Sequence, residues 1–375
     1  MRKSLFAFAL AETCYCCRTH WGVWLRMKFR LPSIGKRFWP SETRDDQPWT
    51  DDDWPIEDSF ETVRGAFNLV FETSGVRIFT ASLIDASHLW TPLLGEKDVV
   101  IFSDPWTSRL EIARAAQAAA RFPENLYFLC NDSQSFYLRK RILRNASLVN
   151  QNCFLDENLF FVDDRAEKIY DALYNARRSK TKRHYLASEI ADVMRLALIY
   201  PHHDNGWYDL EEDQLPKHVY RNKANLRIGQ VAQVINQSSV GLALSESEGA
   251  CFASSEYLLC GVPVVSTPSK GGRSFWYDDE NALIVDADPH AVFGGVSALI
   301  KAPRDPHRIR AAHIALMLRQ RQTFLDEVLA PIAARFSLAD WDYRSAFHAC
   351  DLLKEFGFKK DCWRNLDEIR RTLSG

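Results

Sequence analysis

The segment from Val240 to Asp286 constrains the fold of this chain more than any other part of its sequence. It begins with the apolar run VGLALS (240–245), which closes on an acidic turn at residues 245–249. VPVVST (262–267) is the continuous β-branched run typical of a strand buried on both faces of a parallel sheet. The order of strand, turn, helix-sized gap and strand therefore predicts an open α/β fold.

The gap between these strands predicts a helix from Ser254 to Cys260. Ser254 and Ser255 are suitable N-cap residues because their hydroxyls can accept hydrogen bonds from the first backbone N–H groups of a helix. Gly261 then supplies the left-handed residue at which many helices end. A glycine-rich loop, PSKGGRS (268–274), follows the second strand.

Polar and glycine residues fall where the strands of this segment end. In an open α/β sheet the ligand lies beyond the carboxyl ends of the strands, where loop N–H groups and helix N-termini converge. Residues at such ends are Glu248, Gly249, Gly271 and Gly272. Free N–H groups suit phosphate and carboxylates suit sugar hydroxyls. The segment therefore predicts a site for a phosphorylated or polyhydroxylated ligand.

Four features of the segment, in this order and spacing, resemble the donor-binding half of glycosyltransferase family 4. They are Glu248 and Glu256 with seven residues between them, CGVPVV (260–265), Gly271-Gly272, and ENALIV (280–285). The resemblance is good over residues 164–300 and poor over the first half of the chain. It implies the GT-B fold, in which two Rossmann-like α/β domains face each other across a cleft, and a reaction that retains the anomeric configuration of the sugar.

The resemblance also implies roles for these residues. Glu248 holds and polarises the donor sugar, and Glu256 holds the ribose diol; carboxylates suit both tasks because they accept hydrogen bonds from hydroxyls. The Gly271-Gly272 loop closes over the donor. Further donor-binding positions are Gly249, Ala250, Cys251 and Arg273. Each glutamate has a structural alternative, as a solvated loop charge or as a side chain favoured by a helix dipole.

A basic stretch after the first strand of the second domain matches the family's diphosphate site. KIYDALYNAR (168–177) reads as that strand, and the family has an arginine after it and a lysine five residues later, a spacing that Arg177 and Lys182 match. Fixed cations there stabilise the charge that a diphosphate leaving group gains as the glycosidic bond breaks. A solvated basic turn is the structural alternative. Neighbours that could take the same role are Arg178, Lys180 and Arg183.

Two positions depart from the family pattern. The family usually has a glutamate soon after Gly-Gly, where this chain has Arg273, so the side-chain contacts of this loop differ. The family often has a histidine after a strand of its first domain, where this chain has Phe-Ser-Asp-Pro at residues 102–105. His88 and Asp104 are then the candidates for the acceptor side.

The motifs divide the chain into four parts. They are a basic and then acidic extension expected to be poorly ordered (1–62), a reduced N-terminal Rossmann-like domain on the acceptor side (63–160), the nucleotide-sugar-binding domain (161–334), and C-terminal helices that brace the two domains (335–375). Strands are predicted at 67–73, 76–82, 98–104, 125–132, 196–201 and 281–286. Helices are predicted at 108–121, 133–144, 184–197, 229–237, 289–300 and 308–329.

Composition limits the class of protein and the cellular compartment that the sequence allows. The net charge is −2, which gives no general attraction to nucleic acid. Nine scattered cysteines, an odd number, indicate a reducing cytosol, and we expect no secretion signal. No apolar run reaches the length of a transmembrane helix. Basic and aromatic residues between positions 18 and 39 suit a peripheral membrane contact. The preferred interpretation is a disordered tail, or sequence that lies upstream of a translation start at Met27.

No metal site is expected. The Asp51–Asp53 run lies in a polar, proline-flanked segment with no strand before it and reads as a solvated linker. Cysteines 14, 16 and 17 lack further ligands at zinc-finger spacing. The His-His-Asp run at residues 202–204 reads as a loop end, because adjacent side chains point in different directions.

The sequence thus predicts a cytoplasmic retaining glycosyltransferase without metal or other cofactor. It moves a hexose from a nucleoside diphosphate sugar to a hydroxyl of a glycan, lipid or small molecule. Two alternatives remain open. The first is a nucleotide-sugar-binding protein without catalysis, which would keep the second-domain motifs. The second is a sugar phosphorylase or epimerase of the same fold; a phosphorylase would need a lysine-bound pyridoxal cofactor. The oligomeric state is open as well.

Overall fold

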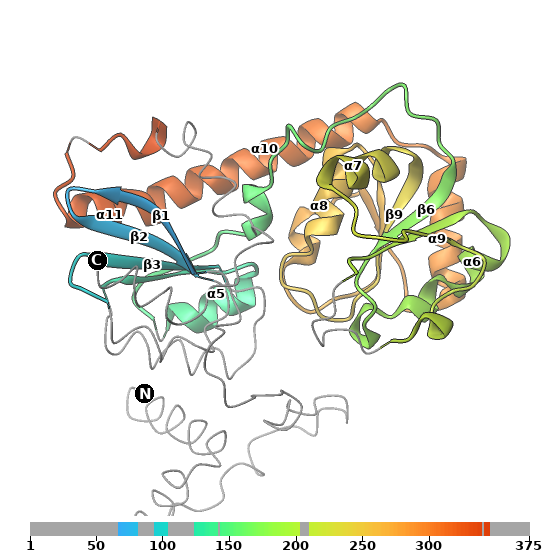
Figure 1. The fold of residues 1–375 in the computed structure, drawn as a ribbon, viewed down its shortest axis with the longest axis horizontal. Helices are drawn as coiled ribbons and strands as arrows, with labels where there is room; N and C mark the ends of the chain where they lie inside the picture. The colour runs from blue at the N-terminus through green and yellow to red at the C-terminus, as the bar shows by residue number, and fades with distance from the viewer. Residues whose placement is uncertain are drawn as a thin grey trace, which may run out of the picture.

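The structure is a computed structural model that describes residues 67–81, 94–103, 124–141, 143–202, 210–339 and 341–345. Within these residues the strands form two separate sheets, one in each half of the chain (Figure 1). Most strand pairs in both sheets are parallel. The predicted α/β class with two Rossmann-like units is confirmed.

The first sheet has five strands in the order β1-β2-β3-β4-β5. They are Phe67–Thr73 (β1), Val76–Ala81 (β2), Asp98–Ser103 (β3), Leu126–Leu129 (β4) and Ala146–Ser147 (β5). β1 and β2 form an antiparallel hairpin whose turn residues, Ser74 and Gly75, both have positive φ, as a two-residue turn between twisted strands requires. The four strands predicted in this half are confirmed to within three residues at their ends.

The helix that follows β4 is shorter than predicted. α5 (Ser133–Lys140) begins after Asp132, whose carboxylate accepts a hydrogen bond from Ser135 N at 2.9 Å. The prediction extended this helix to residue 144, but the chain leaves the helix earlier and pairs with β4 as the strand β5. The helix predicted at 108–121 lies outside the described residues.

The second sheet has six parallel strands in the order β11-β10-β9-β6-β7-β8. They are Tyr170–Asn175 (β6), Leu196–Ile199 (β7), Tyr220–Arg221 (β8), Ser238–Ala243 (β9), Val264–Ser266 (β10) and Ala282–Ile284 (β11). β6 and β9 are the central pair, and the middle residues of both strands, from Ala172 to Tyr174 and from Val240 to Ala243, are buried, as expected of strands covered on both faces. The strands predicted in this half are confirmed: four are shorter than predicted, and β9 is shifted two residues toward the N-terminus relative to the predicted 240–245. β8 is an addition to them.

Short helices surround this second sheet. They are α6 (Ser188–Val193), α7 (Ile228–Asn236), α8 (Phe252–Leu259) and α9 (Pro289–Lys301). Short 3₁₀-helical turns are η5 (Gln151–Phe154), η6 (Lys180–Lys182), η7 (His184–Ala187), η8 (Glu212–Gln214) and η9 (Arg273–Trp276). α7 and α9 confirm the helices predicted at 229–237 and 289–300.

Two helix predictions need correction. The helix predicted from Ser254 begins at Phe252, and its N-cap is Cys251 rather than either serine. Cys251 has a φ of 58°, so the chain enters the helix from a left-handed conformation and both Ser254 and Ser255 are buried inside it. The helix predicted at 184–197 is the turn η7 followed by α6, because its last residues leave it to form β7.

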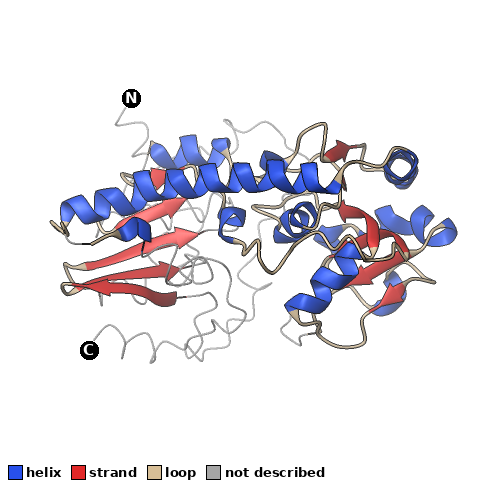
Figure 2. Cartoon of the chain, turned by 90° about the horizontal axis from the view of Figure 1, so that it is seen from above, coloured by secondary structure: helices blue, strands red, loops and turns tan. Residues whose placement is uncertain are grey.

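A long C-terminal helix connects the two halves. α10 (Pro306–Phe324) continues through a π-helical turn (Leu325–Leu329) into α11 (Ala330–Arg335). Figures 1 and 2 show α10 running from the helices of the second half to the first sheet. Arg335 donates to Asn125 Oδ1 at 3.0 Å, and Trp341 stacks on Phe71. The helix predicted at 308–329 is confirmed, and residues 346–375 of the predicted brace lie outside the described residues.

Arg321 anchors α10 to the segment that joins the two halves. Its side chain is 4% exposed and donates to Cys153 O at 2.6 Å and to Leu155 O at 2.9 Å. It also donates to both carboxylate oxygens of Glu157, at 2.9 and 2.6 Å. Burial raises the pKa of Glu157, but the hydrogen bonds and charge of Arg321 more than offset this and hold that pKa below its usual value.

We expect Arg321→Ala to lower the free energy of unfolding by about 3 kcal/mol, because it leaves a partly buried carboxylate and two carbonyl groups without their donor. Arg319→Ala removes an exposed arginine from the same helix and should change the stability by less than about 0.5 kcal/mol. Urea unfolding of both variants measures the difference. Equally small effects would show that Arg321 is not an anchor.

Candidate functional site

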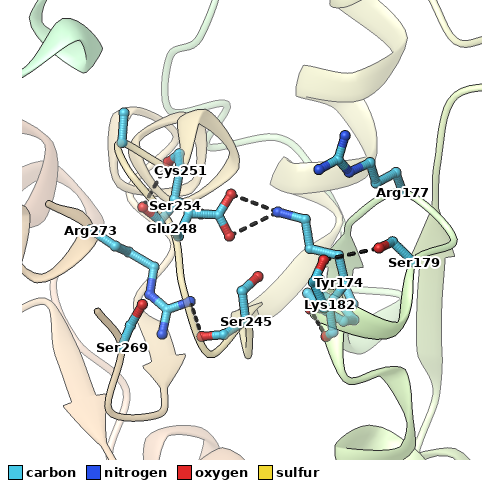
Figure 3. Close-up of polar contacts among 12 residues, drawn as sticks. Tyr174, Arg177, Ser179, Lys182, Ser245, Glu248, Cys251, Ser254, Ser269 and Arg273 are labelled. Atoms are coloured by element: carbon cyan, nitrogen blue, oxygen red, sulfur yellow. Dashed lines mark hydrogen bonds and ion pairs between the residues drawn. The ribbon is translucent and has the colours of Figure 1, made fainter. Parts of the chain in front are cut away.

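The carboxyl ends of β6 and β9 bring the main predicted site residues together. The two strands are neighbours in the parallel sheet, so the loops that follow them lie side by side. The turn η6 follows β6 and carries Lys182, and the loop after β9 carries Glu248. Figure 3 shows these two side chains meeting.

Lys182 and Glu248 form an ion pair at the centre of the site. Lys182 Nζ lies 2.6 Å from Oε1 and 2.8 Å from Oε2 of Glu248. The two side chains are 14% and 13% exposed. Burial raises the pKa of Glu248, but Lys182, with help from Ser245 and Arg273, more than offsets this and holds that pKa below its usual value. Glu248 is therefore ionised at neutral pH.

The turn that carries Lys182 is fixed by hydrogen bonds to its backbone. The hydroxyl of the buried Tyr174 donates to the carbonyl oxygen of Lys182. Ser179 N donates to Arg177 O at 2.9 Å. Arg177 lies two residues beyond the end of β6, and Figure 3 shows its guanidinium group turned toward the Lys182–Glu248 pair. The structure thus brings both predicted cations to one edge of the sheet.

Two further arginines hold loop backbone instead of facing the site. Arg183, in the left-handed region with a φ of 48°, donates to Leu244 O at 2.7 Å and to Thr267 Oγ1 at 2.8 Å. Arg273 is fully buried and donates to Ser245 O at 3.0 Å and to Thr267 O at 2.7 Å. A glutamate, which only accepts hydrogen bonds when ionised, could not bind these carbonyl groups. Arg273 therefore orders the loops after β9 and β10.

The loop that contains Gly271 and Gly272 is hydrogen-bonded to the acidic turn at residues 245–249, called the acidic loop from here on. Gly272 N donates to Gly249 O at 2.7 Å, and Glu248 N donates to Lys270 O at 2.9 Å. Gly271 has a φ of 104°, and a Cβ atom there would lie 2.2 Å from Glu248 O. Only glycine suits this position, because it tolerates both the left-handed backbone and the close approach. The predicted loop thus packs directly against the backbone of Glu248 and Gly249.

Glu256 lies on α8 and faces the end of β6. Its Oε2 accepts a hydrogen bond from Asn175 Nδ2 at 3.2 Å. The hydroxyl of the neighbouring Tyr257 accepts one from Asn175 N at 2.7 Å. Glu248, which the sequence places at a strand end, and Glu256, which it places on the following helix, therefore both lie at the carboxyl end of the central strand pair.

Three buried asparagines that the sequence did not point to tie this site to the first half. Asn150 Nδ2 donates to Gly272 O and to Asn131 O, both at 3.1 Å. Asn152 Nδ2 donates to the carbonyl groups of Ala250 and Cys251 at 2.8 and 3.1 Å. These bonds fix the loop ahead of α8, which holds three predicted donor-binding residues: Gly249, Ala250 and Cys251. Of the three asparagines, Asn131 alone carries a signal in the sequence, because it lies at the end of a predicted strand.

Cys251 is not an activated nucleophile. Burial raises the pKa of its thiol to about 11, with the nearby charge of Glu248 acting in the same direction. At neutral pH the thiol is therefore protonated and weakly nucleophilic. Its place in the site is structural, at the left-handed entrance to α8.

The described residues hold no group of three or more histidine, cysteine or acidic side chains placed for a metal ion. His202, which the sequence assigns to a loop end, has its Nε2 2.7 Å from Asn222 O. His88, Asp104, His203 and Asp204 lie outside the described residues. In the part of the chain that the structure describes, no helix is both long and apolar enough to span a membrane.

Comparisons with known proteins give distant similarities. No protein-family model matches the sequence, and no curated protein matches it. One similar solved structure is sucrose-phosphate synthase from Thermosynechococcus elongatus, with 15% identity over 67% of this chain and 68% of that chain and a TM-score of 0.46. Another is HepE from Anabaena in complex with UDP-glucose, with 15% identity over 67% and 81% of the two chains and a TM-score of 0.47.

A third similar structure is AviGT4, a glycosyltransferase involved in avilamycin A biosynthesis. It has 12% identity over 66% of this chain and 90% of that chain, with a TM-score of 0.42. At these identities and scores, similarity does not carry a substrate or a reaction over to this chain. The function has to follow from its own site.

Proposed function

We propose that this protein is a glycosyltransferase of the GT-B type, which moves a hexose from a nucleoside diphosphate sugar to a hydroxyl group of an acceptor. The observation that supports this most is the contact of Lys182 with Glu248 at the ends of neighbouring strands, with Arg177 at the same edge. Cations suit a diphosphate, and a carboxylate suits sugar hydroxyls. One edge of the sheet thus offers partners for both parts of a nucleotide sugar.

In this proposal Arg177 and Lys182 bind the diphosphate. As the glycosidic bond breaks, the leaving diphosphate gains negative charge, so fixed cations stabilise the transition state more than the ground state. The hydrogen bond from Tyr174 holds the Lys182 turn in place before the reaction begins. The two side chains supply the positive charge, and the proposal needs no metal ion or other cofactor.

The remaining residues bind the sugar and the ribose. Glu248 accepts hydrogen bonds from hydroxyls of the hexose, and Glu256 accepts them from the ribose diol. The Gly271-Gly272 loop lies against the backbone of Glu248 and Gly249 and, in this proposal, closes over the donor. Arg273 holds that loop in place beside the acidic loop by donating hydrogen bonds to the carbonyl groups of Ser245 and Thr267.

We propose retention of configuration, following the resemblance to glycosyltransferase family 4. In a front-face reaction the acceptor hydroxyl attacks on the side that the diphosphate leaves, and a diphosphate oxygen takes the hydroxyl proton. The ionised Glu248 favours the positive charge that develops on the sugar. This reaction needs no protein base on the opposite face of the ring.

The acceptor side belongs to the first half of the chain in this proposal, where His88 and Asp104 are candidates. The acceptor is a glycan, a lipid-linked molecule or a small molecule. We place the protein in the cytoplasm, where nucleotide sugars are supplied, and a lipid acceptor would go with peripheral membrane contact through the basic N-terminal segment. The fold also suits a binding protein without catalysis.

A transfer assay tests the proposal. The purified protein is incubated with UDP-, GDP-, ADP- and dTDP-hexoses and with glycan, lipid and small-molecule acceptors, and release of the nucleoside diphosphate is measured. We expect acceptor-dependent release from one donor class, and an α-linked product from an α-linked donor by proton NMR. Binding without transfer to any acceptor would support a non-catalytic nucleotide-sugar-binding protein. Cleavage that requires inorganic phosphate would support a phosphorylase.

A further inference from the structure

We propose that the Lys182–Glu248 ion pair makes the site discriminate against a free nucleoside diphosphate and in favour of the complete nucleotide sugar. The inference rests on the proposed function, in which Lys182 binds the diphosphate and Glu248 binds the hexose. It starts from the observation that these two groups, assigned to different parts of the donor, are hydrogen-bonded to each other.

A diphosphate has to compete with Glu248 for Lys182. An ammonium group has three donors, and two of those on Lys182 are directed at the two oxygens of Glu248, at 2.6 and 2.8 Å. Both side chains are at most 14% exposed, so water screens this pair less than it screens a pair on the open surface. Binding of the diphosphate to Lys182 therefore weakens a strong existing contact.

Among the described residues, no cation other than Lys182 donates a hydrogen bond to the Glu248 carboxylate. Arg273 contributes favourable charge, but its two Nη atoms donate to Ser245 O and Thr267 O and not to the carboxylate. A hydrogen bond from Ser245 remains and also lowers the pKa of Glu248. A partly buried carboxylate that loses its main partner is destabilised. When a free nucleoside diphosphate binds Lys182, Glu248 therefore loses the cation that balances its charge.

The hexose of a nucleotide sugar removes this penalty. Its hydroxyls are donors, and in the proposed function they lie against Glu248 and replace the ammonium group. Binding of the sugar and binding of the diphosphate are then coupled through one ion pair. After transfer the hexose is gone, Glu248 recovers Lys182, and release of the nucleoside diphosphate is favoured.

Calorimetric titration of Glu248→Gln with UDP, GDP, ADP and dTDP tests the inference. The amide keeps the shape of the side chain but not the charge that holds Lys182. We expect the nucleoside diphosphate that binds the native protein to bind this variant about tenfold more tightly. The corresponding nucleotide sugar should gain less, so the preference for the complete donor shrinks.

Glu246→Gln is the matched control. Glu246 lies in the same loop and is exposed, so this variant removes the same charge from the neighbourhood without touching the ion pair. We expect its affinity for the nucleoside diphosphate to stay within about twofold of the native value. Glu248→Asp is a second variant, in which the shortened carboxylate keeps its charge but reaches Lys182 less well. It should give an intermediate gain.

The outcomes separate the inference from the proposed function. Unchanged or weaker nucleoside diphosphate binding by Glu248→Gln and Glu248→Asp, or an equal gain in Glu246→Gln, overturns the inference and leaves the diphosphate site standing. Lys182→Ala provides the other arm. If that variant binds the nucleoside diphosphate as tightly as the native protein does, or if no nucleoside diphosphate binds at all, the proposed site is wrong and the inference fails with it.

Discussion

Replacement of Lys182 by alanine is expected to lower the rate of sugar transfer by about 10²–10³-fold, the usual effect of removing a fixed group that stabilises transition-state charge. Lys182 Nζ is held in the site by the Glu248 carboxylate and by the η6 turn. Its contact with the diphosphate strengthens as the leaving group gains charge, so both kcat and kcat/KM should fall. Steady-state release of the nucleoside diphosphate measures both.

Lys180→Ala controls for a general loss of positive charge. Lys180 is exposed and lies in the same turn, so this variant should keep transfer within about twofold of the native rate. Because Lys182→Ala also leaves Glu248 without its cation, it should lose about 1–3 kcal/mol of stability. Thermal unfolding shows whether enough folded protein is present. If Lys182→Ala transferred sugar as fast as Lys180→Ala, the assigned role of Lys182 would be wrong.

Gly272→Ala is expected to have the largest effect on the geometry of the site. A Cβ atom at this position would lie 2.2 Å from Asn131 O and 2.6 Å from Gly249 O. Both are backbone atoms, one in the first half and one in the acidic loop, so neither can turn aside as a flexible side chain can. We expect a loss of about 2–3 kcal/mol in the free energy of unfolding and much weaker nucleotide-sugar binding as the loop moves.

Gly294→Ala is the matched control for this substitution. Gly294 lies within α9, and a Cβ atom there would have no atom within 4 Å. Alanine favours helix over glycine by up to about 1 kcal/mol, so this variant should be as stable as the native protein or more stable. Urea unfolding and calorimetric titration are applied to both. Equal stability and equal affinity in the two variants would contradict the close packing of Gly272.

The sequence predicts the sheet strands well. A continuous apolar run such as VPVVST has to be buried on both faces, and the inside of a parallel sheet provides this. The order of those strands is harder to predict. Lys182 and Glu248 are separated by 66 residues, and they meet because β6 and β9 are neighbours in the sheet. Their spacing relative to nearby motifs identified each residue, but only the topology shows that they bind each other.

Other features depend on contacts that local patterns do not record. Arg273 falls in the glycine-rich loop and reads as a donor-binding side chain, yet burial against two carbonyl groups turns it inward. The capping prediction at Ser254 was wrong because Cys251 adopts a left-handed conformation, which is uncommon for a residue with a side chain. Asn150 and Asn152 carry no periodicity or motif, and their roles follow from the distant loops that they reach.

The central claim is that the edge formed by β6 and β9 binds a nucleoside diphosphate. The most direct test is calorimetric titration of the native protein with UDP, GDP, ADP and dTDP, repeated with Lys182→Ala and Glu256→Ala. We predict binding of one nucleoside diphosphate with a dissociation constant on the order of micromolar, about 8 kcal/mol of binding free energy, and its loss in both variants. No binding of any of the four, or binding that both variants retain, would contradict the claim.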